Sequence, residues 1–170
     1  MYIGLFVWSL AFSGMADQAY LKHEVFEKDK SANKAVVFLS QICPCSNGHV
    51  RHLNQLISKH PKVSFFGVIS EPVTSKNKKE IEAYFTQKRF SFPIIRDDEQ
   101  FLVKKYGALK TPHVTLLRDG KIAYQGGVTN KKLFKESSKK FLEVNLELLA
   151  ENKKFKYRRG SSLGCYIRRY

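Results

Sequence analysis

Cysteines, acidic residues and known ligand-binding motifs are all scarce in this sequence of 170 residues. The three cysteines are too few for a fold built on disulfides, and their odd number leaves at least one thiol unpaired within a monomer. There is no internal repeat, zinc-finger spacing, nucleotide-binding glycine loop or haem motif, so no cofactor and no nucleic-acid partner are expected. A hydrophobic content of 43% excludes a disordered chain, and the length suits one folded domain after the N-terminal segment.

Acidic residues are outnumbered two to one, since 30 Lys and Arg face 15 Asp and Glu for a net charge of +15. Part of this excess lies in residues 153–170, which show no amphipathic period and are predicted to form an extended basic arm that carries Cys165. The arm is either a solvated end of the chain or a docking element for an acidic partner or anionic surface.

Residues 2–16 contain no charge, but this run of about fifteen residues is shorter than the roughly 20 that a membrane-spanning helix needs. We predict that residues 1–16 form a signal peptide and that the protein is exported to the periplasm or the extracellular space without a stable membrane span. The run lacks the initial Lys or Arg of a signal, so an uncleaved anchor facing the periplasm and a buried helix remain alternatives. Export would place the thiols in a compartment where disulfides form.

The hydrophobic pattern predicts strands that alternate with helices. Strands are expected over residues 35–40, 63–70, 92–95, 114–117 and 121–124, and helices over residues 47–59, 75–89, 97–106 and 131–151. Asp119-Gly120 is a strong hairpin signal, and Ser46 is expected to cap the helix over residues 47–59. This order predicts an α/β protein with a central mixed sheet flanked by helices.

Cys43-Pro-Cys-Ser46 lies between a buried strand and a helix. Unpaired N–H groups and the helix dipole at such a position favour the thiolate, which makes Cys43 a candidate nucleophile. Pro44 is expected to fix the turn, and Ile42 to exclude water on one side.

Two other interpretations of these thiols remain open. Cys43 and Cys45 could be inert buried residues, as isolated cysteines often are. They could also bind Cu(I) or zinc together with His49 or His113, although only two ligands are secure and no metal site is predicted.

Residues 35–126 resemble the thioredoxin-like redoxins of the alkyl hydroperoxide reductase/thiol-specific antioxidant and TlpA/ResA type. The matching segments are Phe38-Leu-Ser-Gln-Ile-Cys-Pro-Cys-Ser46, Phe92-Pro93, Tyr106-Gly107, Thr111-Pro112 and Asp119-Gly-Lys-Ile-Ala-Tyr-Gln-Gly126. In addition, Leu163-Gly-Cys-Tyr-Ile167 resembles the Gly-Cys-x-Ile ending of a subgroup with a Cys-Pro-Cys-Ser turn.

The resemblance implies a thioredoxin-like domain over residues 17–152 with an inserted helix-strand unit. It implies that Cys43 is the nucleophile and that Thr111-Pro112 is a cis-proline loop that binds substrate. Ser46 takes the place of the second cysteine of a thioredoxin motif, so that motif is broken.

The sequence leaves the disulfide pairing open. A Cys43–Cys45 bond would close a tight, easily reduced ring, whereas Cys165 could fold back to Cys43 on its arm. A structural Cys45–Cys165 bond is the third pairing.

We predict a thiol-disulfide oxidoreductase whose partner is a thiol or disulfide protein or a small redox molecule. One alternative is a peroxidase, because Ser40 lies three residues before Cys43, but Val36 stands where the peroxiredoxin motif has proline. Metal handling and a binding module without catalysis are the remaining alternatives.

Overall fold

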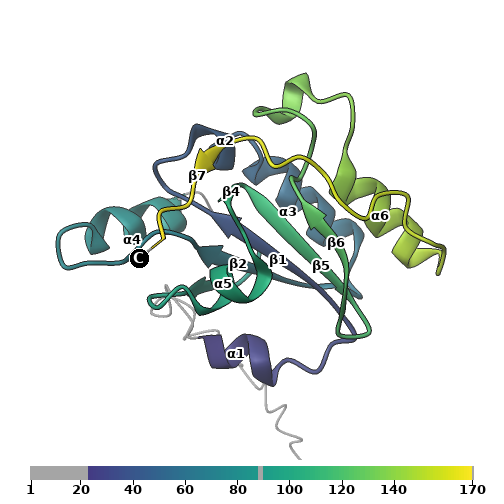
Figure 1. Cartoon of the computed structure of the whole chain (residues 1–170), viewed down its shortest axis with the longest axis horizontal. Helices are drawn as coiled ribbons and strands as arrows, with labels where there is room; N and C mark the ends of the chain where they lie inside the picture. Colours follow the sequence, from purple (N-terminus) through teal and green to yellow (C-terminus); the bar gives the residue numbers. More distant parts are fainter. Residues whose placement is uncertain (1–22, 88–89, 170) are drawn as a thin grey trace, which may run out of the picture.

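A five-stranded mixed sheet with the strand order β3-β2-β1-β5-β6 forms the centre of the computed structural model (Figure 1), which describes residues 23–87 and 90–169. β1 is parallel to β2, and β2 to β3, whereas β5 is antiparallel to both β1 and β6. The strands are β1 (Asn33–Leu39), β2 (Ser64–Ile69), β3 (Ile94–Arg96), β5 (His113–Arg118) and β6 (Lys121–Gly126). The predicted signal peptide lies outside the described residues, so export stays a prediction.

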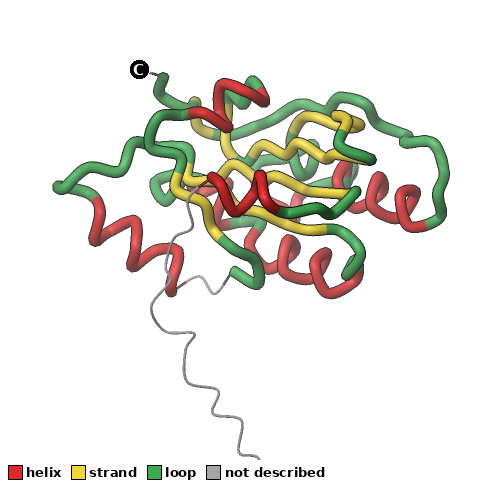
Figure 2. Tube along the Cα trace, turned by 90° about the horizontal axis from the view of Figure 1, so that it is seen from below, coloured by secondary structure: helices red, strands yellow, loops and turns green. Residues whose placement is uncertain are grey.

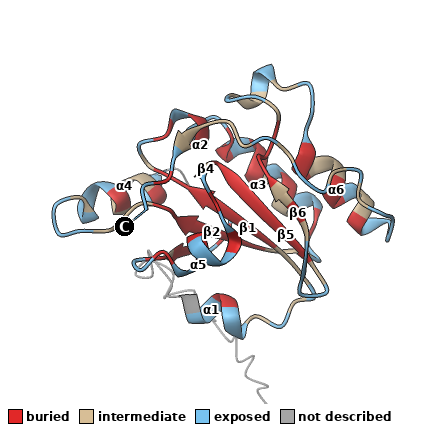
Figure 3. Cartoon of the chain, viewed as in Figure 1, coloured by how far each residue is buried: buried red, intermediate tan, exposed pale blue. Residues whose placement is uncertain are grey.

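Most residues of the central strands are apolar and buried because both faces of the sheet are covered. In β1, Val37 points into one core and Val36 and Phe38 point into the other, as strand alternation requires. Figure 3 shows this sheet as the most buried part of the chain. Asp119 and Gly120 have φ values of 51° and 72° and form the predicted turn between β5 and β6.

Helices cover the two faces of the sheet (Figure 2). One face packs against α3 (Val50–Lys59), α4 (Lys78–Gln87) and α6 (Phe141–Ala150). The other packs against α1 (His23–Lys28) and α5 (Phe101–Tyr106). The α4–β3 unit adds the edge strand to the sheet and is the inserted helix-strand unit that the resemblance implied.

Three helix predictions are wrong in part. The helix expected over residues 97–106 starts only at Phe101. The helix expected over residues 131–151 starts only at Phe141, and the residues before it form a loop with one 3-10 turn, η1 (Phe134–Glu136). Asn130 closes this loop, because its side-chain oxygen accepts the N–H groups of Ser138 and Lys139. The apolar side chain of Phe134 stacks on His52 from the loop, with ring centroids 3.9 Å apart.

The helix predicted after Ser46 is divided into α2 (Pro44–Asn47) and α3, with Gly48 and His49 between them. Ser46 is therefore inside α2 and is not its cap. It is fully buried, and its hydroxyl accepts the N–H of Ser40 at 3.2 Å.

The basic arm is extended, as predicted, but it is tied to the domain along its length (Figure 1). The side chain of Asn145 exchanges two hydrogen bonds with the backbone of Tyr157, and the Gly160 N–H donates to the carbonyl of Gln125 at 3.0 Å. Residues 161–169, which we call the strap, then form β7 (Cys165–Tyr166), antiparallel to β4 (Lys110–Thr111).

Candidate functional site

Cys43 lies where β1 has ended and α2 begins, as the sequence predicted. Its N–H donates to the Ser40 carbonyl at 3.3 Å, and Pro44 occupies the first turn of α2. The Cys43 side chain is fully buried, and its Sγ donates to the Thr111 carbonyl oxygen at 3.2 Å. The expectation that Ile42 shields this thiol is wrong, because the Ile42 side chain is 71% exposed.

The Thr111–Pro112 peptide bond is cis, which confirms the cis-proline loop. β4 ends at Thr111 immediately before this bond, and β5 starts at His113 immediately after it. The loop therefore lies at the end of a central strand, and its Thr111 carbonyl faces the sulfur of Cys43.

All three cysteines meet at this loop, and all three are free thiols. Cys165 is opposite Thr111 in the β4–β7 register and hydrogen-bonds to Cys43 through both its N–H and its thiol. Cys45 hydrogen-bonds to Cys43 from within α2. The structure thus assembles the three predicted residues, and their pairing in an oxidised state stays a prediction.

Hydrogen bonds make Cys43 the most acidic of the three thiols. Burial raises the pKa of Cys43, but interactions with Thr111, with Cys165 and with the Ser46 N–H lower this pKa to about 7. α2 has only four residues, so individual donors hold the thiolate rather than a long helix dipole.

The pKa values of the two neighbouring thiols, Cys45 and Cys165, shift in the opposite direction. The hydrogen bond with Cys43, followed by burial, raises the pKa of Cys165 to about 11. Burial, followed by the charge on Cys43, raises the pKa of Cys45. Near pH 7 Cys43 is therefore partly ionised, whereas the other two sulfurs keep their protons.

Glu71 is a site residue that the sequence analysis missed. It follows β2, and its carboxylate accepts the Gln41 N–H at 2.8 Å and a hydrogen bond from the Ser40 hydroxyl. Burial, the largest effect, raises the pKa of Glu71. The Ser40 hydroxyl, which the peroxidase alternative needs, is thus bonded to Glu71. An acid directly after a buried strand was the signal available in the sequence.

Of the two histidines considered as metal ligands, His49 uses both ring nitrogens in hydrogen bonds, whereas the buried Nε2 of His113 has no hydrogen-bond partner among the described residues. His49 is bonded through Nδ1 to the Cys45 carbonyl at 2.8 Å and through Nε2 to the Thr129 hydroxyl at 3.0 Å. His113 packs against Phe38 with ring centroids 5.8 Å apart. Within residues 23–87 and 90–169, no group of three or more His, Cys, Asp or Glu side chains is arranged to hold a metal ion.

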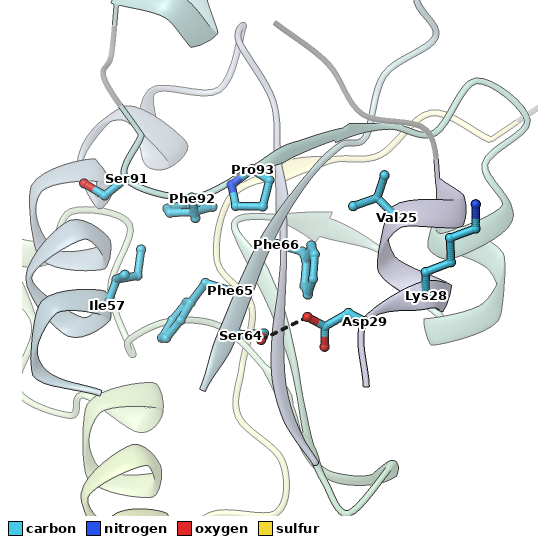
Figure 4. Close-up of a pocket in the computed structure, with 10 residues that line it drawn as sticks. All are labelled: Val25, Lys28, Asp29, Ile57, Ser64, Phe65, Phe66, Ser91, Phe92 and Pro93. Atoms are coloured by element: carbon cyan, nitrogen blue, oxygen red, sulfur yellow. Dashed lines mark hydrogen bonds between the residues drawn. The ribbon is translucent and has the colours of Figure 1, made fainter. Parts of the chain in front are cut away.

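A cavity of about 560 Å³ lies at the other end of the sheet, near the start of β2 (Figure 4). Phe65 and Phe66 line it from alternate sides of the strand, and the Ser64 hydroxyl donates to Asp29 at 3.2 Å. No cysteine lines this cavity, so it is separate from the thiol site. No helix in the described part of the chain is both long enough and apolar enough to cross a bilayer.

The strand order, the cis-proline before β5 and the cysteine after β1 define a thioredoxin-like fold, which confirms the predicted fold class. Within that class, the chain is similar to an uncharacterised conserved protein from Geobacillus kaustophilus, with 24% identity, a TM-score of 0.69, and coverage of 82% of this chain and 78% of that one.

Two other solved structures share the fold. A hypothetical protein from Sinorhizobium meliloti is 20% identical with a TM-score of 0.71, over 84% of this chain and 82% of that one. StoA from Bacillus subtilis is 23% identical with a TM-score of 0.50, over 58% of this chain and 75% of that one. No protein-family model and no curated protein matches the sequence. The subgroup with the Gly-Cys-x-Ile ending therefore stays a prediction.

Proposed function

We propose that this protein is a thiol-disulfide oxidoreductase in which Cys43 is the nucleophile. The observation that carries the proposal is the hydrogen bonding of Cys43 by Thr111, Ser46 and a second cysteine, which favours its ionisation near neutral pH. A thiolate with a pKa near the ambient pH combines a high ionised fraction with good nucleophilicity toward disulfides.

The reaction begins when the Cys43 thiolate attacks one sulfur of a partner disulfide. A bond forms between Cys43 and that sulfur, and the second partner sulfur leaves as a thiolate with the electron pair of the broken bond. A second cysteine then attacks the Cys43 sulfur and releases the first partner sulfur as a thiolate. The partner gains two electrons, and the protein ends with one internal disulfide.

We assign the second attack to Cys165. Cys45 is two residues from Cys43, and a disulfide between them would close a small ring. Cys165 comes from a separate strand and already contacts Cys43. Its raised pKa keeps it protonated while Cys43 is charged, and a mixed disulfide on Cys43 removes that charge, so the thiol of Cys165 becomes easier to ionise.

The test is a single turnover of the prereduced protein with a disulfide-bonded protein. We expect Cys43→Ser to abolish reduction of the partner, and Cys165→Ala to accumulate a mixed disulfide detectable by mass spectrometry. The matched variant Cys45→Ala should resolve the mixed disulfide as the wild type does. Wild-type turnover by Cys43→Ser would refute the proposal, and faster oxidation of Cys43 by hydrogen peroxide than by disulfides would favour a peroxidase instead.

A further inference from the structure

The reactive thiol of this protein is closed off by the chain itself. Cys43 has no exposed surface, although an attacking thiolate must touch its target. The strap lies beside it: Cys165 pairs with Thr111, and the Ile167 N–H donates to the Leu109 carbonyl at 2.9 Å. In Figure 1 the yellow strap passes between α2 and β4. A partner disulfide can reach Cys43 only when the strap leaves this position.

The strap is held by short contacts rather than by a long strand: the Ser162 hydroxyl donates to the Pro112 carbonyl at 2.8 Å, and the Gln100 side-chain amide donates to the Arg168 carbonyl. β7 has only two residues, and its Tyr166 side chain is 76% exposed. One buried apolar side chain, Ile167, inserts from the strap into the core around α5. Because residues 157–160 are bonded separately to Asn145 and Gln125, the strap can detach while the preceding arm stays in place.

The strap also shows what kind of strand can pair with β4 (Lys110–Thr111). A Cβ added to Gly164 would lie 1.7 Å from the Thr111 carbonyl oxygen, far inside contact distance. The residue before the cysteine must therefore be glycine for the strand to lie this close to β4. The residue after the cysteine is not restricted in size in this way, because the side chain of Tyr166 is 76% exposed.

We propose that the Lys110–Thr111 edge is a docking site for an extended segment of a partner protein in which glycine precedes a disulfide-bonded cysteine, and that the strap occupies this edge until the partner displaces it. The inference rests on the proposed function. A strand that adds to an exposed edge gains backbone hydrogen bonds whatever its sequence, whereas the glycine position supplies selectivity.

The single turnover is completed when the strap returns to the Lys110–Thr111 edge. Docking places the partner cysteine where Cys165 lay, and the Cys43 thiolate breaks the partner disulfide as described above. When the strap rebinds, the Cys165 sulfur attacks the Cys43 sulfur and loses its proton to solvent. The partner sulfur leaves as a thiolate, and the same strand pairing that forms the Cys43–Cys165 bond removes the partner segment from the edge.

The test compares two peptides, Ser-Leu-Gly-Cys-Tyr-Ile and Ser-Leu-Val-Cys-Tyr-Ile, each carrying thionitrobenzoate in disulfide linkage to its cysteine. The prereduced full-length protein is mixed with each peptide, and release of the chromophore is followed by stopped flow. We expect the glycine peptide to react about tenfold faster, which corresponds to a difference of about 1.4 kcal/mol between the two docked peptides. Equal rates would overturn the proposed selectivity. If neither peptide nor free dithionitrobenzoate reacts with Cys43, the proposed function itself fails.

Strap displacement is tested with neighbouring substitutions. Ile167→Ser removes the buried anchor and should accelerate the reaction with the glycine peptide by about tenfold, whereas Arg168→Ser changes an exposed side chain and should not. Gly164→Val gives a second loosened strap in case Ile167→Ser does not fold. Rates are divided by the thiolate fraction of Cys43 in each variant. Wild-type rates in both loosened variants would show that the strap does not limit access.

Discussion

At the scale of single residues, the chemistry of this protein is decided by the neighbours of one sulfur atom. Cys43 is buried, and burial alone would keep its thiol protonated. Donors from Thr111, Ser46 and Cys165 reverse this effect, and Cys165 becomes harder to ionise in return. The two sulfurs therefore differ in charge because they share a hydrogen bond.

This arrangement predicts the pH dependence of the Cys43 thiolate. Ultraviolet absorbance of the reduced protein should rise with a midpoint near pH 7 as Cys43 ionises. Cys165→Ala removes one thiol donor, so the midpoint should move upward by about one pH unit, which corresponds to a hydrogen bond of about 1.4 kcal/mol. Cys45→Ala removes no donor that lowers the pKa of Cys43 and serves as the control. An unchanged midpoint in Cys165→Ala would contradict this assignment.

The residues of the site differ in how far the sequence revealed them. Cys43 and Pro112 are marked by motifs that a short stretch of chain can carry. Glu71 is not, because its role depends on contacts with Ser40 and Gln41 across the sheet. The burial of Cys43 by the strap also depends on contacts between distant segments. The prediction that Ile42 shields Cys43 from water was wrong.

At the scale of elements, short helices depend on specific contacts at their ends. α5 has six residues, and Asp97 lies just before it. The Asp97 carboxylate accepts the N–H of Leu102 at 3.0 Å and the N–H of Val103 at 2.9 Å. These bonds satisfy donors that the first turn of a helix leaves free. α5 lies under the strap, because Leu102, Val103 and Ile167 belong to one apolar cluster.

Asp97→Ala should therefore lower the free energy of unfolding by roughly 2 kcal/mol, since it removes a buried acceptor from two helix N–H groups. Glu99→Ala, two residues away at an exposed position, should change this free energy by less than about 0.5 kcal/mol. Urea denaturation of both variants measures the difference. Equal stabilities for the two variants would show that Asp97 does not hold the start of α5.

The wrong helix boundaries have a common cause at this scale. Apolar spacing correctly predicted α6 but extended it over residues 131–140, where Asn130 organises a loop. Leu133 and Phe134 are apolar because they cover α3 from that loop, and a sequence pattern cannot separate this burial from helix periodicity. The Gly48-His49 interruption between α2 and α3 likewise depends on a contact, the bond from His49 to the Cys45 carbonyl.

At the scale of the whole molecule, buried histidines connect the fold to pH. Burial is the largest effect on His49, His52, His60 and His113, and it lowers the pKa of each. A histidine whose pKa is lower in the folded protein than in the unfolded chain binds its proton preferentially after unfolding. Its contribution to stability is complete above pH 6.5 and is lost as the pH falls through the folded value.

The pKa shift of His113 sets the size of this loss of stability. Burial lowers its pKa from 6.5 to about 4, so this residue should account for roughly 3 kcal/mol of the stability lost between pH 6.5 and pH 4. His113→Phe keeps a ring against Phe38 and removes the proton site. Denaturation at several pH values should show a shallower loss of stability on acidification in this variant. The slope, rather than stability at neutral pH, is the deciding measurement, and an unchanged slope would contradict the prediction.

The sequence by itself determined the α/β order, the mixed sheet, the hairpin at Asp119-Gly120, the cis-proline loop and the position of Cys43, because each follows from local periodicity or from a short motif. Only the tertiary structure decided where Cys165 lies, since its place depends on strand pairing with Thr111, far away in the chain. It also decided that the basic arm is tied to the domain and closes the thiol site. Hydrophobic patterns and turn residues act within a few positions, whereas the ionisation and the access of Cys43 depend on atoms that folding brings together.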